Sequence, residues 1–294
     1  MKQQDAYKLL AAFMILIMII VPVAYVITSP RSSTESQTTG EQPPQDKYNP
    51  AFWIVNQPFY SISDALNMTP YGAIMADYVD LEGMTPQMSQ WARQNFQIIG
   101  EADSVYKSNS TIVYYSNLNS GKNNSFLLLN TMSPEKNDFE YIMLPNTNNI
   151  PILIRQEQQL SGLYNIMGNP VILAPPETAI EVLDIIYSQN KTTTAYDQYE
   201  GLLSKVEPAQ LQIVNSNVSF ANQFYMGIGM TNGTYERTTG YFNINSSSLA
   251  KLNQLKTNST QRGFAQYNIT RSGNYTIVKI ASPNLFNILS EETS

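Results

Sequence analysis

Four Ser-x-x-Lys pairs have the residue types and spacing for nucleophilic chemistry, because a lysine close after a serine can take its proton. They are Ser104 with Lys107, Ser133 with Lys136, Ser188 with Lys191, and Ser248 with Lys251. The Lys-Thr-Gly sequence that accompanies this pattern in Ser/Lys enzymes is absent from the chain. Since the pairs also fall in four unrelated segments, we interpret them as polar surface.

Two groups of carboxylates could bind a cation or transfer protons. Glu177, Glu181 and Asp184 share one face of a predicted helix, but the opposite positions are apolar, so this acidic face is interpreted as solvated. Asp77, Asp80 and Glu82 lie close together on a predicted strand. Asp77 and Asp80 point to opposite faces of a regular strand, so a calcium site would need further oxygen ligands from elsewhere.

The chain contains no histidine and no cysteine. This excludes Ser-His-Asp and Cys-His catalysis, imidazole or thiolate metal sites, haem held through histidine, and disulfides. Carboxylate chemistry, a Ser/Lys pair and oxygen-ligated hard cations stay open. We assign no catalytic, cofactor or metal residue, and the sequence leans against an enzyme. The formal net charge of −6 disfavours nucleic acid as a partner.

Residues 9–27, LLAAFMILIMIIVPVAYVI, carry no charge. As a helix they would reach about 28 Å, close to the ~30 Å hydrocarbon core of a bilayer, so we predict a transmembrane helix. Lys2 and Lys8 favour a cytoplasmic tail at 1–8, with everything after the span outside the cell membrane. A cleaved signal peptide and a buried soluble helix are the alternatives. The long apolar core and the lack of a small-x-small cleavage site favour an uncleaved anchor.

Residues 28–48 are rich in Ser, Thr, Gln and Pro, which predicts a disordered tether. Beyond it the acceptor pattern Asn-x-Ser/Thr is frequent: it occurs ten times in the chain, where the composition predicts roughly five. Asn67 is the weakest candidate because Pro70 follows its threonine. The remaining glycosylation candidates are Asn109, Asn123, Asn190, Asn217, Asn232, Asn245, Asn258, Asn268 and Asn274.

Four turn signals separate apolar stretches and predict antiparallel hairpins. They are 119–122, Gly168-Asn169, Asn232-Gly233 and Ser272-Gly273. Helices are predicted from Pro86 to Ile99, from Pro176 to Tyr187, after Ser246, and after Pro283. The expected fold is therefore α+β, with a mostly antiparallel sheet and packed helices.

Both halves of the ectodomain show the same predicted order of strand, helix and hairpin. In the first half these are 73–81, 86–99 and 111–130, and in the second 238–245, 249–257 and 264–281. This suggests two related α+β modules, 49–189 and 190–294, although one continuous domain is also open. Seven of the 19 tyrosines fall on predicted strands, where they suit either packing or contact with a protein or glycan partner.

This layout of anchor, Ser/Thr tether and Cys-free, sequon-rich ectodomain resembles the uncharacterised signal-anchored surface glycoproteins of methanogenic archaea. The resemblance covers the whole chain, rests on layout and composition, and implies an archaeal cell-envelope glycoprotein without implying an activity. Our first hypothesis is a non-enzymatic surface binding protein. The alternatives are a carboxylate-dependent enzyme acting on envelope polysaccharide, which needs two carboxyl groups in one cleft, and a carrier, which needs an enclosed apolar cavity.

Overall fold

The computed structural model describes residues 52–119, 124–144, 150–187 and 192–293. The predicted cytoplasmic tail, transmembrane helix and tether lie outside these ranges. Within them, no helix has the length and apolar character needed to cross a bilayer.

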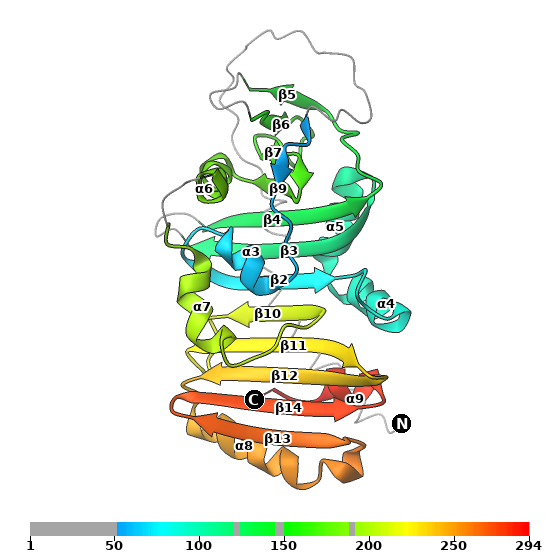
Figure 1. The fold of residues 1–294 in the computed structure, drawn as a ribbon, viewed down its shortest axis with the longest axis vertical. Coiled ribbons are helices and arrows are strands. Elements are labelled where there is room, and N and C mark those ends of the chain that lie inside the picture. The colour runs from blue at the N-terminus through cyan, green and yellow to red at the C-terminus, as the bar shows by residue number, and fades with distance from the viewer. Residues whose placement is uncertain (1–51, 120–123, 145–149, 188–191, 294) are drawn as a thin grey trace.

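A twelve-stranded sheet runs through the centre of the molecule, and all its neighbouring strands pair antiparallel (Figure 1). In spatial order its strands are β13 (Gln266–Ser272), β14 (Tyr275–Ser282), β12 (Thr234–Phe242), β11 (Gln223–Thr231), β10 (Leu211–Asn215), β2 (Ala73–Asp80), β3 (Asn109–Asn119), β4 (Asn124–Ser133), β9 (Val171–Ala174), β7 (Tyr164–Ile166), β6 (Leu153–Arg155) and β5 (Tyr141–Met143). A separate short pair, β1 (Val55–Asn56) and β8 (Gly168–Asn169), is parallel.

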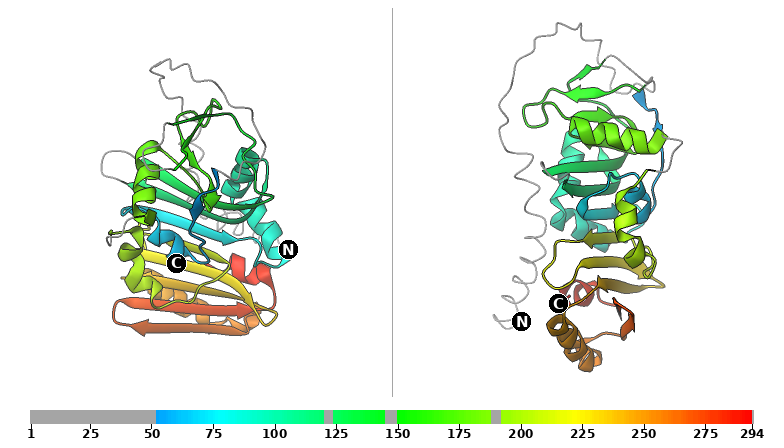
Figure 2. Two further views of the ribbon diagram at one scale, coloured as in Figure 1. Left: turned by 45° about the horizontal axis from the view of Figure 1, so that its top comes forward. Right: turned by 90° about the vertical axis from the view of Figure 1, so that its left-hand side faces the viewer.

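Helices cover both faces of the sheet (Figure 2). One face carries α4 (Pro86–Asn95), α5 (Gln97–Tyr106), α8 (Ser246–Thr257) and α9 (Leu285–Ser290), and the other carries α3 (Ile62–Asn67), α6 (Pro176–Tyr187) and α7 (Ala195–Leu203). A short 3-10 helix, η2 (Thr260–Arg262), follows α8. Each face buries its own apolar cluster, and each cluster contains residues from both halves of the chain. The expected α+β class with a mostly antiparallel sheet is confirmed.

The predicted hairpins form where the turn chemistry indicated them. Asn232 and Gly233 adopt φ values of 51° and 80°, the two left-handed residues that a tight β11–β12 turn needs. In the β13–β14 hairpin the two central residues are Gly273 and Asn274, one position later than expected, because Ser272 pairs with Tyr275. The β3–β4 and β7–β9 pairs are antiparallel as predicted.

The helix predicted from Pro86 to Ile99 is instead two helices. Thr85 caps α4 as expected, with its hydroxyl accepting from Met88 N, but Phe96 takes an extended conformation and ends the helix. Its ring packs at 5.9 Å from Trp91, buried in the core, which favours a kink over a continuous helix. Gly100 does not end the second helix, because α5 continues to bury Ala102 and Tyr106 before Lys107 closes it in a left-handed conformation.

The two halves share the order of their elements but not the pairing of their strands. In the first half β2 pairs with β3, the first strand of the following hairpin. In the second half β12 pairs with β14, the second strand of its hairpin. The halves are joined edge to edge, since β2 also pairs with β10 along five residues of each strand.

Candidate functional site

The Ser-x-x-Lys pairs place no lysine as a base for a serine in the described part of the chain. Lys107 Nζ lies 3.9 Å from Asp138 Oδ2, Lys136 Nζ donates to the Lys107 carbonyl at 3.0 Å, and Lys251 Nζ lies 2.5 Å from Glu292 Oε2. Ser188 and Lys191 are outside the described residues. These lysines therefore serve ion pairs and backbone carbonyls.

The acidic candidates separate into three environments. Glu177, Glu181 and Asp184 are exposed on α6, consistent with a solvated face. Asp80 turns back to accept from Gly83 N at 2.8 Å. Across the described ranges, no group of three or more carboxylates is placed to hold a metal ion.

Asp77 is the exception, because it is 4% exposed in the middle of β2. Its cross-strand neighbours are Tyr115 on β3 and Ile213 on β10, and its carboxyl accepts no hydrogen bond from the residues that the structure describes. Burial raises the pKa of Asp77 to about 7. Burial also raises the pKa of Glu101 on α5. It raises the pKa of Tyr115 as well, and the negative charges of Asp77 and Glu101 raise that pKa further. Asp77 is buried and Glu101 is partly buried, and each lies near enough to Tyr115 to raise the pKa of its hydroxyl.

The glycosylation candidates lie on the surface wherever the structure describes them. Asn109, Asn217, Asn232, Asn245, Asn258, Asn268 and Asn274 are all exposed, as is Asn67. Asparagines outside the acceptor pattern are not uniformly so, since Asn130, Asn137, Asn165 and Asn215 are buried. Asn123 and Asn190 fall outside the described residues. The strand tyrosines behave differently: among those predicted, only Tyr275 is not buried, so they belong to the core.

A partly open cleft of about 330 Å³ lies where β3 begins and β4 ends. Three aromatic residues, Trp53, Phe59 and Tyr60, form one part of its wall. Its polar side chains are two carboxylates, three hydroxyls and one carboxamide: Glu82, Glu135, Thr111, Thr131, Ser133 and Asn169. Among the residues that the structure describes, no lysine or arginine lines it.

Local structure explains how these side chains meet. A register shift between Ser110 and Ile112 leaves Thr111 outside the regular ladder, and its hydroxyl lies 2.7 Å from that of Thr131. Gly168 lets the β1 segment approach closely: a Cβ there would be 2.4 Å from the Val55 carbonyl oxygen. Gln57 N donates to Asn169 O at 2.9 Å and fixes the aromatic segment against the rim.

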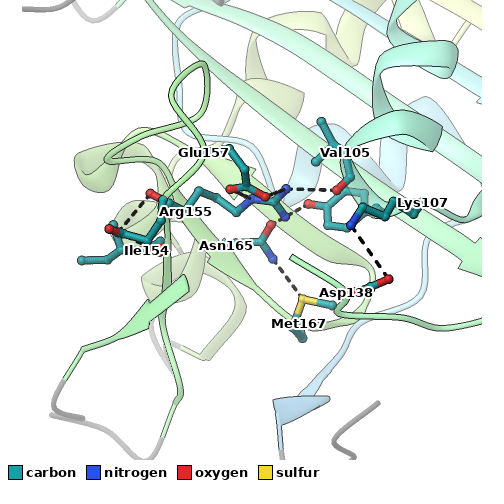
Figure 3. Close-up of polar contacts among 10 residues, drawn as sticks. Val105, Lys107, Asp138, Ile154, Arg155, Glu157, Asn165 and Met167 are labelled. Atoms are coloured by element: carbon teal, nitrogen blue, oxygen red, sulfur yellow. Dashed lines mark hydrogen bonds and ion pairs between the residues drawn. The ribbon is translucent and has the colours of Figure 1, made fainter. Parts of the chain in front are cut away.

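A buried polar cluster surrounds Arg155 (Figure 3). Arg155 on β6 is 1% exposed, and its guanidinium makes two hydrogen bonds to Glu157, at 3.0 and 2.8 Å, and one to the Val105 carbonyl at 3.0 Å. It also lies 3.7 Å from the centre of the Phe139 ring. Burial lowers the pKa of Arg155, while Tyr106 and Glu157 act to raise it.

The same cluster continues toward the cleft through β7. Tyr106 donates to Asn165 Oδ1 at 2.9 Å, and Asn165 Nδ2 lies 3.0 Å from the sulfur of Met167. The Met167 carbonyl then accepts from Ile54 N at 3.2 Å, within the segment that carries Trp53. We therefore regard Arg155 as a structural residue that positions the cleft wall.

Sequence reasoning did not find either feature. The cleft combines segments around residues 53–60, 82, 111, 131–135 and 168–169, which no local pattern connects. Arg155 follows an apolar stretch, and the one local signal for an ion pair is Glu157, two positions later.

Comparison with known proteins shows no family for this chain. No family model matches the chain, and no curated protein matches it. Among solved structures, crystal forms III, IV and I of the protein TP0453 match the chain with TM-scores of 0.44, 0.42 and 0.42 and sequence identities of 12%, 10% and 10%. The matches cover 76–77% of this chain and 95–97% of those chains.

Proposed function

We propose that this protein is a membrane-anchored, extracytoplasmic binding protein whose ectodomain is N-glycosylated and non-enzymatic. Residues 9–27 would span the cell membrane, 28–48 would form the tether, and 49–294 would face outward. The ligand or partner, a surface component of the same envelope or an external molecule, would engage the cleft that contains Trp53, Tyr60, Glu82 and Glu135.

The exposure of the acceptor asparagines is the observation that carries the location. A glycan can be attached only where the asparagine side chain reaches solvent, and each of the eight described acceptor asparagines does so. Six of them follow residue 211, around the sheet end formed by β11 to β14. The cleft lies instead beside β3, β4 and β8, so sugar on those six sites would leave it accessible.

The cleft supports binding better than transport of an apolar ligand. Its aromatic wall offers contact area at low entropic cost, and its carboxylates and hydroxyls give direction. A carrier would need an enclosed apolar chamber, whereas this cleft is partly open and half lined by polar side chains.

Intact-mass analysis of the protein purified from its own cells tests the location. We expect a mass above the 33.0 kDa of the full polypeptide, lowered stepwise when acceptor asparagines are changed to glutamine. Protease added to intact cells should remove the ectodomain and leave a fragment containing residues 9–27. A mass equal to an unmodified chain that lacks the apolar segment would contradict both the anchor and the glycans.

One observation favours a second candidate, an enzyme acting on envelope polysaccharide. Glu82 and Glu135 line the same cleft, as the acid and base of a glycosidase do. Release of reducing ends from envelope polysaccharide, abolished in both Glu82→Gln and Glu135→Gln but kept in Glu181→Gln on the α6 surface, would establish it. Absence of release by the native protein would favour the binding role.

A further inference from the structure

We propose that the β5 end of the sheet rests on the lipid surface to which the chain is anchored. The exposed side chains of Ile142 and Met143 enter the boundary between the lipid headgroups and the acyl chains. This inference rests on the proposed membrane anchor and adds a second, reversible contact with the same bilayer. Three features lead to it: an exposed apolar row, the place where the described chain begins, and the positions of the acceptor asparagines.

A row of apolar side chains crosses the last three strands at this end of the sheet. Ile142 on β5 pairs with Ile154 on β6, and Ile154 pairs with Tyr164 on β7, so the three side chains share one face. Tyr164 packs against the apolar cluster on the face that carries α6. That helix packs against β4, β9 and β7. Beyond β7 the row is open to solvent, since Ile154 is partly exposed and Ile142 is 46% exposed.

The strand β5 is the terminal strand of the sheet in the described part of the chain. Met143 follows Ile142 on this strand and is 47% exposed. An exposed apolar edge promotes aggregation unless something covers it. A second copy of the chain is a poor cover, because β5 is three residues long and a stable protein interface needs about 800 Å² from each partner. A lipid surface can take up single apolar side chains, because its binding scales with the apolar area buried.

The described chain begins close to this end of the molecule (Figure 1). The ring of Phe52, the first described residue, lies 5.9 Å from the ring of Tyr141, the first residue of β5. Between the predicted span, which ends at residue 27, and Phe52 there are 24 residues, 28–51. A flexible chain of that length spans about 25–30 Å. The tether therefore holds β5 near the bilayer at a high effective concentration, so that a weak apolar contact is sufficient.

The acceptor asparagines lie away from this end. None of the eight described ones is on β5, β6 or β7, and the six after residue 211 lie around β11 to β14. The strand β13 is eleven strand spacings from β5, which is about 50 Å at ~4.8 Å for each spacing. Sugars are polar and stay in water. With β5 on the lipid and β13 pointing outward, those six sites face away from the membrane.

The contact is shallow and uses side chains, because the backbone of a terminal strand cannot enter hydrocarbon. Its outer N–H and C=O groups need water or headgroups as partners. Glu140, exposed and directly before β5, keeps its carboxylate at the level of the headgroups. Since the attraction is apolar, added salt should not weaken it.

Site-directed fluorescence on the full chain tests the contact. The chain contains no cysteine, so one introduced cysteine carries the only label. A nitrobenzoxadiazole fluorophore is attached at Ile142→Cys or at Met143→Cys, and the protein is reconstituted into phosphatidylcholine vesicles at a low ratio of protein to lipid. Phe286→Cys on α9 is the matched control, because Phe286 is also apolar and is 53% exposed.

We expect lipid that carries a nitroxide near the top of its acyl chain to quench the labels at residues 142 and 143 at least about twofold more than the label at residue 286. Added NaCl should leave this difference unchanged. Ile142→Asn, introduced beside the label at residue 143, should reduce the quenching, because a polar amide resists transfer out of water. Phe286→Asn is the control for this change and should leave the quenching at residue 143 as it was.

Each outcome supports or overturns the contact. Quenching at residue 142 no stronger than at residue 286 overturns it, and so does a blue-shifted emission at residue 142 without lipid quenching, which indicates cover by protein. Quenching at residue 143 that Ile142→Asn leaves unchanged overturns the assignment to the apolar row, provided that far-UV circular dichroism shows the variant folded. Flotation of the native chain with the vesicles tests the anchor. A chain that does not float contradicts the proposed anchor, whereas one that floats without quenching contradicts this inference alone.

Discussion

At the residue scale, Arg155 keeps a charge inside an apolar layer because its planar fork reaches Glu157 and the Val105 carbonyl together while its face rests on Phe139. A lysine carries the same charge but cannot make a bidentate contact or stack in the same way. We expect Arg155→Lys to lower the free energy of unfolding by about 2–4 kcal/mol, measured by urea denaturation. Arg271→Lys, on the exposed end of β13, is the control and should change it by less than about 0.5 kcal/mol. A loss as small as that of the control would contradict the role given to Arg155.

The buried carboxyl of Asp77 makes a pH-dependent contribution with a definite sign. Its pKa is about 7 in the folded protein against an ordinary value of 3.8, so the folded state binds the proton more tightly than the unfolded state. Between about pH 4 and pH 7 the Asp77 carboxyl is ionised in the unfolded chain but still protonated in the folded protein. Rising pH therefore stabilises the unfolded state, and the free energy of unfolding falls. Below this window the contribution is favourable, and above it the loss is complete.

Replacing Asp77 with asparagine should remove that dependence. We expect Asp77→Asn to be about as stable as the native protein at pH 4 and more stable at pH 8, by about 2–4 kcal/mol. The measurement is the difference between the two unfolding free energies at each pH, which cancels groups common to both proteins. Asp184→Asn, exposed on α6, should show no such trend. An equal difference at both pH values would show that Asp77 is not protonated on folding.

At the scale of elements, Asn245 serves α8 as its N-cap and is also a glycosylation candidate. Its Oδ1 accepts from Ser248 N at 2.8 Å, while its Nδ2 is the atom that a glycan would occupy. Asn245→Ala removes both functions, Asn245→Asp keeps the cap, and Ser247→Ala keeps the cap but breaks the acceptor pattern. In unglycosylated protein we expect Asn245→Ala to cost about 1 kcal/mol and the other two to cost markedly less.

The same three variants in glycosylated protein should each lose the mass of one glycan, in addition to the small mass change of the substitution, because each destroys the acceptor sequence. Thermal unfolding and intact mass together therefore separate the cap from the glycan. If Asn245→Asp were as destabilised as Asn245→Ala, the capping role would be contradicted.

Features that depend on interactions between residues close in sequence were predicted correctly, whereas features that depend on distant contacts were not. The β11–β12 turn was predictable because Asn232 and Gly233 supply their own positive φ values, and Thr85 was predictable as a cap because it acts within three residues. Phe96 broke a helix for a reason that lies in the core, so local pattern missed it. The short helices α3 and α7 were missed as well, although Ser61 caps α3 by accepting from Asp64 N and the Asp197 carboxylate accepts from Thr194 N at the start of α7.

The candidate cleft could not be predicted from the sequence at all. Its walls depend on Gly168 admitting the β1 segment and on a register shift at Thr111, and both are consequences of strand pairing between distant segments. The acceptor asparagines, by contrast, could be listed from the sequence pattern alone, and the structure places each described one at the surface.

At the scale of the whole molecule, the pairing of β2 with β10 joins two halves into one sheet, where the sequence left both two modules and one continuous domain open. Both apolar clusters cross this boundary, with Tyr78 and Tyr225 in one and Val79 and Ile213 in the other. Tyr199 on α7 adds a hydrogen bond to the Ala73 carbonyl at 2.9 Å. Unfolding either half alone would expose a sheet edge and both sides of its core.

We therefore expect the part of the chain that the structure describes to unfold in one cooperative transition. Trp53 and Trp91, the only tryptophans, both lie in the first half, so fluorescence reports that half while far-UV circular dichroism reports both. The two signals should give the same urea midpoint. Neither half should stay folded once the other unfolds, because the two share one sheet and both apolar clusters. Replacing Tyr199 with phenylalanine should lower both midpoints together. Separate midpoints for fluorescence and circular dichroism would instead mean that the β2–β10 junction is a weak interface between two independently stable units.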